Sequence, residues 1–255
     1  LFPELSLTGY TCGDLFFQEA LQTATLEGLS QIVKTSSDYP ALTVVVGLPV
    51  CVTGQVYNCA AVVGRGKLWG IIPKTFLPNY GEFYERRWFA SSQDLPVKEV
   101  PIGDLGTVPI GRDLLFTLGD GTVLGVEVCE DLWAPMPPST MMRLNGAEVI
   151  VNLSASNELV GKRAYRQNLV THQSAVCSCV YALCSSGSTE STQDLVMSGH
   201  SLIAQDGKLI CENKDLIASD YLLVQDVDLG TVRARRRHNT SIRDAISIYS
   251  QIQPM

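Results

Sequence analysis

The chain has 255 residues, and its 45% hydrophobic content is enough for one large domain with a sizeable buried core. The formal net charge of −7 argues against nucleic acid or an anionic membrane surface as the main partner. No apolar run is long enough to span a bilayer. Eight cysteines are too few for a disulfide scaffold, so we expect free thiols and a cytoplasmic protein.

The first half of the chain predicts one helix, one strand and a hairpin. Apolar residues at three- and four-residue steps predict a helix from Asp14, as its N-cap, to about Thr35. The β-branched run LTVVVGLPV predicts a buried strand over 42–50. Two apolar runs around a Gly-Arg-Gly-Lys turn predict a hairpin over 58–74.

The second half of the chain predicts further hairpins separated by helices. The expected elements are a hairpin over 114–129, a short helix carrying Arg143 between Pro135 and Asn145, a strand over 147–156, a helix over 162–177, a strand over 180–186, a hairpin over 198–212 and a strand over 220–229. Hairpins argue against an all-parallel sheet. They favour mixed sheets with helices on their outer faces, in a single domain.

Three ionisable residues each follow an apolar run that reads as a strand. Glu4 follows LFP, Lys74 follows LWGIIP, and Cys129 follows GVEV. Strand ends are rigid places from which a protein presents reactive groups, although a single one of them is more often a solvated terminus. Two acids, Glu130 and Asp131, come directly after the cysteine, and acid beside a thiol raises its pKa. A reactive Cys129 therefore needs a positive charge from elsewhere in the chain.

The strings around these residues resemble the nitrilase, or carbon–nitrogen hydrolase, superfamily. The triple is Glu4 in FPELSLTGY, Lys74 in PKTFLPNYGEFYERRWF and Cys129 in VEVCEDLW. Within that superfamily TGYTCGDLF, LPNYGEFYERRWFAS, VCEDLWAPMPPS and NLSASNE look like the glutaminase domain of glutamine-dependent NAD synthetase, with matches from Leu1 to about Arg243. Such a set is far more specific than one short motif. It implies a four-layer α-β-β-α sandwich of two mixed sheets.

The resemblance implies a Cys-Lys-Glu mechanism. Cys129 would attack the side-chain amide carbon of glutamine and form a thioester. Lys74 would favour the thiolate and stabilise the oxyanion, with the backbone N–H after the nucleophile as second donor. Glu4 would carry the proton to departing ammonia and then activate water. Glu82 would hold Lys74 in place, and the alternative for Glu82 is a solvated loop charge.

The resemblance also implies contacts with the substrate. Tyr80 and Phe83 would shape the glutamine pocket, with ordinary core packing as the alternative for both. Ser156 and Lys162 fall where the family contacts substrate, and Lys162 stands where some members carry arginine. Glu130 would accept hydrogen bonds from the substrate α-ammonium, which explains the acid beside the thiol.

The family's full-length enzyme has a second domain that this chain does not match. We expect residues 1–255 to be the glutaminase domain, truncated at its N-terminus, without the ATP-dependent synthetase domain. The resemblance implies no cofactor or metal here, with ATP, Mg²⁺ and deamido-NAD bound only in the missing domain. It further implies L-glutamine as substrate, an internal ammonia tunnel to the synthetase domain, and a homo-oligomer. The fragment alone would then make no NAD.

Two other functions stay open at this point. The first is a stand-alone nitrilase-type amidase with another amide substrate, and the second is a non-catalytic member kept for assembly or regulation. The basic run 232–243 is expected to be a solvated segment or a subunit contact rather than a nucleic-acid site, because the chain as a whole is acidic. The spacing of Cys177, Cys179 and Cys184 fits no common zinc site.

Overall fold

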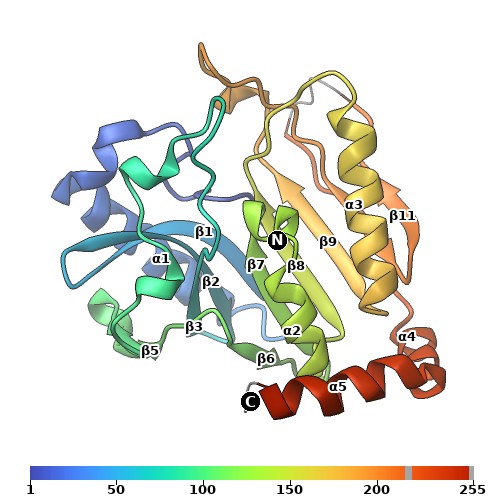
Figure 1. Cartoon of the computed structure of the whole chain (residues 1–255). Coiled ribbons are helices and arrows are strands. Elements are labelled where there is room, and N and C mark those ends of the chain that lie inside the picture. Colours follow the sequence, from blue (N-terminus) through green and yellow to red (C-terminus); the bar gives the residue numbers. More distant parts are fainter. Residues whose placement is uncertain (216–219, 253–255) are drawn as a thin grey trace.

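The computed structural model describes residues 1–215 and 220–252, with only the backbone described for 250–252. Two β-sheets pack face to face, and helices cover their outer sides (Figure 1). The narrower sheet is antiparallel and consists of β1 (Thr43–Val52), β2 (Gln55–Gly64) and β3 (Lys67–Pro73). The wider sheet has the order β11-β10-β9-β8-β7-β6.

The wider sheet is mixed. Its strands are β6 (Leu115–Thr117), β7 (Val123–Val128), β8 (Val149–Ser154), β9 (Val180–Ser185), β10 (Leu202–Gln205) and β11 (Lys208–Glu212). The neighbours β7, β8 and β9 run parallel, and the other pairs are antiparallel. A separate two-stranded sheet pairs β4 (Glu99–Pro101) with β5 (Thr107–Pro109).

The helices include five α-helices and several short 3-10 turns within the described residues. The α-helices are α1 (Glu19–Ser36), α2 (Pro138–Leu144), α3 (Lys162–Val176), α4 (Leu229–His238) and α5 (Thr240–Ile252). The 3-10 turns are η1 (Gly13–Phe17), η2 (Glu85–Arg87), η3 (Ser92–Asp94), η4 (Gly103–Leu105), η5 (Cys129–Trp133) and η6 (Ser188–Glu190). No helix in the described part of the chain is both long and apolar enough to cross a membrane.

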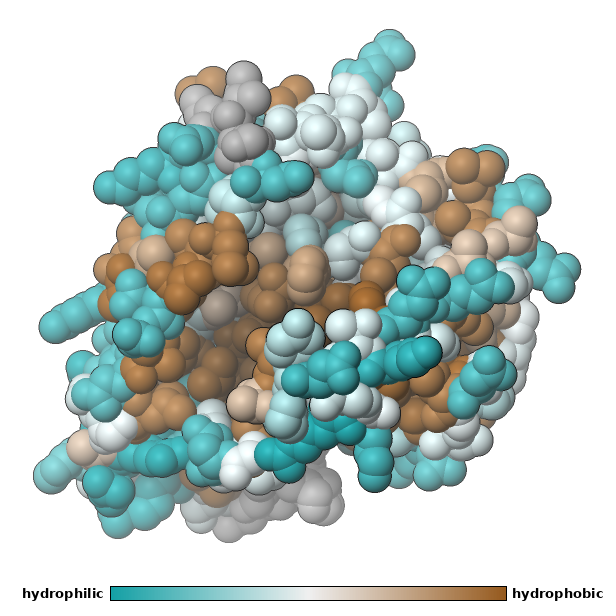
Figure 2. Space-filling model, turned by 180° about the vertical axis from the view of Figure 1, so that it is seen from behind, coloured by the Kyte–Doolittle hydropathy of each residue, from teal (hydrophilic) through white to brown (hydrophobic). Residues whose placement is uncertain are grey.

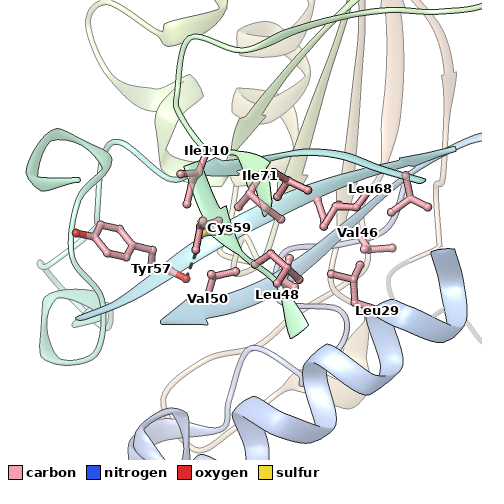
Figure 3. Packing of buried hydrophobic residues seen from close by; sticks show 14 of the residues in the cluster. Leu29, Val46, Leu48, Val50, Tyr57, Cys59, Leu68, Ile71 and Ile110 are labelled. Atoms are coloured by element: carbon pink, nitrogen blue, oxygen red, sulfur yellow. Dashed lines mark hydrogen bonds between the residues drawn. The ribbon is translucent and has the colours of Figure 1, made fainter. Parts of the chain in front are cut away.

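Three apolar layers hold the sheets and helices together, because alternate residues of each strand point to opposite faces. Between α1 and the narrower sheet lie Leu29, Val46, Leu48, Val50 and their neighbours (Figure 3). Between the two sheets lie Val45, Val62, Ile72, Val126, Val128 and Val151. Between the wider sheet and α2 and α3 lie Met142, Ile150, Val170, Tyr181 and Leu202. The predicted α-β-β-α sandwich is thus confirmed.

The two sheets differ in width. The wider sheet meets the narrower one through β6, β7 and β8, and β9 contributes only the partly buried Ala182 to the layer between them. Seen from behind, apolar residues gather around a hollow in the middle of the molecule (Figure 2). The predicted strand over 220–229 is wrong: residues 221–228 belong to no helix or strand, Leu229 begins α4, and Leu222 and Val224 are 86% and 73% exposed.

The chain before α1 also differs from expectation. The predicted helix start at Asp14 is wrong, because η1 ends at Phe17 and an extended Gln18 precedes α1. Asp14 does not cap a helix. Its carboxylate instead accepts hydrogen bonds from Arg87, at 2.8 Å, and from the indole N–H of Trp88, at 2.9 Å.

Glu4 lies on a turn rather than after a strand. Residues 4–8 form this turn, and its backbone is hydrogen-bonded to both sheets: Glu4 N donates to Ser154 O at 3.3 Å, and Leu7 N donates to Gly47 O at 3.0 Å. The turn lies so close to β1 that a Cβ at Gly47 would be 2.2 Å from Leu5 N. Glycine at this position therefore allows the turn to approach the sheet.

The basic run is exposed in part, and three of its arginines bind other parts of the fold. Its arginines attach α4 to the end of the wider sheet: Arg233 binds Glu148 at 2.7 and 2.9 Å, and Arg235 binds Asp206. Arg236 donates to three backbone carbonyls, those of residues 146, 147 and 178. The expectation of a solvated segment thus holds for Arg235 and Arg237, which are exposed, but not for Arg236, whose guanidinium group satisfies acceptors of the fold. A subunit contact through this segment stays a prediction.

Candidate active site

The predicted Glu4, Lys74 and Cys129 come together at one end of the sandwich. Lys74 directly follows β3, Cys129 directly follows β7 as the first residue of η5, and Glu4 lies on the turn packed against β1. All three are buried, with exposed fractions of 1% for Glu4, 0% for Lys74 and 6% for Cys129. The narrower sheet and its adjoining turn therefore supply the lysine and the glutamate, and the wider sheet supplies the cysteine.

Lys74 is held by two carboxylates. Its Nζ donates to Glu4 Oε1 at 2.6 Å and to the two oxygens of Glu85 at 2.8 and 2.9 Å. The hydroxyl of Tyr10 donates to Glu85 at 2.8 Å. Burial alone would lower the pKa of Lys74, but Glu4 and Glu85 raise it well above its usual value, so the side chain is an ammonium. The expected support by Glu82 is wrong, since the second carboxylate on Lys74 is Glu85.

The carboxylate of Glu4 has one occupied and one free oxygen. Oε1 accepts from Lys74 and from Asn58 Nδ2, each at 2.6 Å. Oε2 is buried and has no hydrogen-bond partner in the described part of the chain. Buried oxygens without a partner are rare in proteins, and such an atom is available to accept a proton from a neighbour.

The thiol of Cys129 is protonated in this environment. Burial raises its pKa, and the charges of Glu4 and Glu85 raise it further, whereas Lys74 and the backbone N–H of Ala155 lower it. The expectation that Lys74 makes a thiolate is thus corrected: its effect has the predicted sign, but burial and the two carboxylates outweigh it. A base is required to remove the proton.

The backbone at Cys129 is strained. Its φ of +43° lies in the left-handed region, which costs a non-glycine residue roughly 1–3 kcal/mol. Asp131 fixes the turn from one side, because its Oδ2 accepts from Val128 N at 3.1 Å, and its Oδ1 accepts from the backbone N–H groups of Thr75 and Phe76 at 3.0 and 2.8 Å. This carboxylate joins the turn that carries the cysteine to the segment that follows Lys74.

Tyr80 and Glu130 lie together at the mouth of the site. The hydroxyl of Tyr80 donates to Glu130 Oε1 at 2.7 Å. Burial raises the pKa of Glu130, and the hydrogen bond from Tyr80 opposes that shift. Core packing of Tyr80 is excluded, because the side chain is 61% exposed.

Lys162 lies between two aromatic rings. Its Nζ is 5.6 Å from the ring centre of Phe83 and 5.2 Å from that of Trp133, which is the range of cation–π contacts. Nζ also donates to Asn157 Oδ1, and Asn157 Nδ2 donates to Glu82. Glu82 therefore belongs to the surroundings of Lys162. Trp133 and Asn157 were not among the residues expected from the sequence.

Ser156 is buried and lies two residues after the end of β8. Its hydroxyl accepts from Arg166 Nη2 at 3.3 Å, and its backbone N–H donates to Ser185 Oγ at 3.2 Å. A hydroxyl has one hydrogen to donate besides its acceptor sites, so Ser156 keeps a donor for another group.

The remaining titratable side chains form no metal centre. Within residues 1–215 and 220–252, no group of three or more His, Cys, Asp or Glu side chains is placed to hold a metal ion. His200 is buried with its Nδ1 2.7 Å from Arg166 Nη1. Burial and the charge of Arg166 lower the pKa of His200 to about 4, so this ring is neutral near pH 7.

A four-layer sandwich that buries a glutamate, a lysine and a cysteine where its sheets meet defines a nitrilase-type protein. The model of the carbon-nitrogen hydrolase family matches residues 1–237, and the chain belongs to that family. The fold also resembles a crystal structure of a carbon-nitrogen hydrolase from Helicobacter pylori, with a TM-score of 0.73 over 98% of this chain and 85% of that one, at 20% identity.

More similar relatives are glutamine-dependent NAD(+) synthetases. The protein of that name from Mycobacterium leprae is 37% identical over 268 residues, which cover all of this chain and 39% of the relative. The human one is 29% identical, over 94% of this chain and 35% of its own length. The crystal structure of the Cytophaga hutchinsonii enzyme is 33% identical, with a TM-score of 0.72 over 84% of this chain and 34% of that chain. The chain thus spans about two fifths of these relatives' length or less.

Proposed function

We propose that this chain hydrolyses the side-chain amide of L-glutamine and is the glutaminase unit of a glutamine-dependent NAD synthetase. The observation that carries this proposal is the free, buried Oε2 of Glu4 beside a protonated Cys129 and a cationic Lys74. This set contains a proton acceptor, a nucleophile and a positive charge, which are the groups that amide hydrolysis needs. The similarity to NAD synthetases supports glutamine as the amide.

In the first half of the reaction, Glu4 Oε2 takes the proton of the Cys129 thiol and the sulfur attacks the amide carbon. The carbonyl oxygen becomes an oxyanion, which Lys74 Nζ and the backbone N–H of Glu130 stabilise. The tetrahedral species collapses with cleavage of the C–N bond. Glu4 gives the proton to the departing nitrogen, which leaves as ammonia, and a thioester to Cys129 remains.

In the second half, Glu4 removes a proton from water, and the resulting oxygen attacks the thioester carbon. The same two donors stabilise the second oxyanion. Cleavage of the C–S bond releases glutamate, and the proton held by Glu4 returns to the sulfur. The cycle ends with the protonated thiol with which it began.

The residues at the mouth of the site suit an amino acid with both charges. Glu130 would accept from the α-ammonium, and Lys162 would bind the α-carboxylate. Tyr80 and Phe83 would form the walls, and the hydroxyl of Ser156 would donate to the substrate. In this arrangement Glu130 binds the substrate and takes no part in deprotonating Cys129.

The ammonia would pass through an internal tunnel to a synthetase domain that uses ATP, Mg²⁺ and deamido-NAD, which this chain would not bind. The support is that the relatives named as NAD synthetases are much longer than this chain. We expect a homo-oligomer in the cytoplasm, without nucleic-acid or membrane partners.

The test is intact-mass analysis with peptide mapping after incubation with 6-diazo-5-oxo-norleucine, a glutamine-like electrophile. We expect one adduct on Cys129 that excess glutamine prevents, and glutaminase activity that Cys129→Ala abolishes. Cys51→Ala is the matched control, because this thiol is exposed and outside the site. Activity that survives in Cys129→Ala would overturn the nucleophile. Turnover of simple aliphatic amides in place of glutamine would instead indicate a stand-alone amidase.

A further inference from the structure

A side chain from the neighbouring strand holds the backbone of the nucleophile. Asn152 on β8 is fully buried, and its Oδ1 accepts from the backbone N–H of Cys129 at 3.1 Å. Its Nδ2 donates to the carbonyl of Cys129 at 3.3 Å. The hydroxyl of Ser154 donates to Oδ1 at 2.8 Å. One amide thus binds both polar groups of the strained residue, and a serine fixes that amide in turn.

The hydrogen bond to the carbonyl has a consequence for the next residue. The carbonyl of Cys129 and the N–H of Glu130 belong to one planar peptide unit and point in opposite directions. Because Asn152 binds the carbonyl on the β8 side, the N–H of Glu130 is turned away from β8. This N–H lies in the first turn of η5, where backbone N–H groups have no partner within the helix.

We propose that Asn152 is a positioning residue that orients the Cys129–Glu130 peptide, so that the N–H of Glu130 and not a carbonyl faces the oxyanion. This proposal rests on the proposed amide hydrolysis. Asp131 fixes the Glu127–Val128 peptide through Val128 N, whereas Asn152 binds the two peptide units on either side of the Cys129 Cα, through Cys129 N and Cys129 O. Without Asn152 this peptide is free to rotate, and rotation relieves the left-handed strain at Cys129 and withdraws the donor.

The experiment separates the donor and acceptor functions of Asn152. Asn152→Asp keeps the size and the acceptor for Cys129 N–H but loses the donor to the carbonyl, whereas Asn152→Ala loses both. Ser154→Ala only loosens the amide and serves as the milder variant. Ile150→Val is the control, because Ile150 lies on the same strand but packs in the outer layer against the helices.

We measure kcat and KM for glutamine and the rate at which iodoacetamide alkylates Cys129. Both Asn152 variants are expected to lower kcat by about 10²–10³-fold, the usual effect of losing one oxyanion donor. The value of KM and the alkylation rate should stay within about threefold, since alkylation forms no oxyanion. Ser154→Ala should lower kcat by a smaller factor, and Ile150→Val should leave it within about twofold.

Three results would overturn the proposal: an unchanged kcat in Asn152→Asp, an equal fall in kcat and in alkylation, or an equal fall in Ile150→Val. A crystal structure of Asn152→Ala with the Cys129–Glu130 peptide unmoved would also overturn it, whatever the substrate. Should the wild type hydrolyse another amide and not glutamine, the proposed substrate fails. In that case the ratios of variant to wild-type kcat, measured with that other amide and compared with the alkylation rates, test the role of Asn152.

Discussion

Two carboxylates compete for one ammonium in a place from which water is excluded. Glu4 and Glu85 both bind Lys74, so the cluster carries one negative charge too many when all three side chains are ionised. Burial raises the pKa of Glu85 to about 7, and the charge of Glu4 adds to the shift while Lys74 opposes it. The cluster therefore gains a proton close to neutral pH.

This shift predicts how stability depends on pH. The pKa of Glu85 rises from its usual 4.5 to about 7 on folding, so its contribution to stability is complete below pH 4.5 and is lost as the pH rises through 7. Glu85→Gln removes the titration. We therefore expect the wild type to lose about 2 kcal/mol of unfolding free energy relative to Glu85→Gln when the pH is raised from 5 to 8.

Urea denaturation at the two pH values measures this difference. Glu82→Gln is the matched control, because it removes a carboxylate of the same loop that does not bind Lys74. A difference between wild type and Glu85→Gln that stays constant with pH would show that Glu85 does not titrate in this range.

The sequence indicates some residues of the site better than others. Lys74 and Cys129 were predictable because each follows an apolar run that reads as a strand. Glu85 was not, because GEFYERRWF offers two glutamates three residues apart, and the loop conformation decides which one turns inward. Asn152 stands inside an apolar strand, where a polar residue surrounded by AEVIV and LS is a signal that sequence reasoning passed over.

At the scale of elements, the close contact between the Glu4 turn and β1 predicts a large effect from one methyl group. In Gly47→Ala the new Cβ would lie 2.2 Å from Leu5 N, so the turn must move. Displacing a catalytic group by about 1 Å can cost 100-fold in rate, and we expect at least that loss in kcat for glutamine.

Gly28→Ala is the matched control for this substitution. Gly28 lies on α1 with nothing within 4 Å of an added Cβ, so the alanine should stabilise the helix by up to about 1 kcal/mol and leave kcat unchanged. Steady-state kinetics should show a lower kcat in Gly47→Ala and an unchanged kcat in Gly28→Ala. Wild-type activity in Gly47→Ala would mean that the turn does not position the base.

The attachment of α4 predicts a loss of stability without a loss of chemistry. Arg236→Met leaves three backbone carbonyls in the segments that lead into β8 and β9 without this donor, which should cost about 1–3 kcal/mol in the free energy of unfolding. Arg237→Met, at an exposed position on the same helix, should change it by less than about 0.5 kcal/mol. Thermal melts compare the two, and equal melting temperatures would contradict the anchoring role of Arg236.

Helices and hairpins were predictable because their signals lie within one segment of the sequence. A strand that needs a distant segment to pair with was not. The hairpin over 58–74 and the helix over 162–177 were confirmed as β2–β3 and α3. The segment over 220–229 has the apolar run typical of a strand but pairs with no neighbour in the described structure. An apolar run can favour a strand, but the hydrogen bonds that make it one come from another segment.

At the scale of the whole molecule, hairpins and buried strands indicated mixed sheets with helices outside, but not four layers. The layer between the sheets joins Val62 to Val151, residues that are neighbours only in space. Periodicity says that a face is buried and not what it is buried against. The four-layer arrangement came from the family resemblance, and the structure confirms it.

The origin of the site residues from both sides of the sandwich has a mechanical consequence. Slippage between the sheets would separate the Cys129 sulfur from Glu4 and Lys74, the proposed base and counter-charge, while every helix and strand stays intact. The catalytic rate should therefore report whether the two sheets are still packed against each other. In rising urea we expect glutaminase activity to vanish at concentrations where far-ultraviolet circular dichroism is still native, and coincident transitions would show that the halves separate only when the whole fold melts.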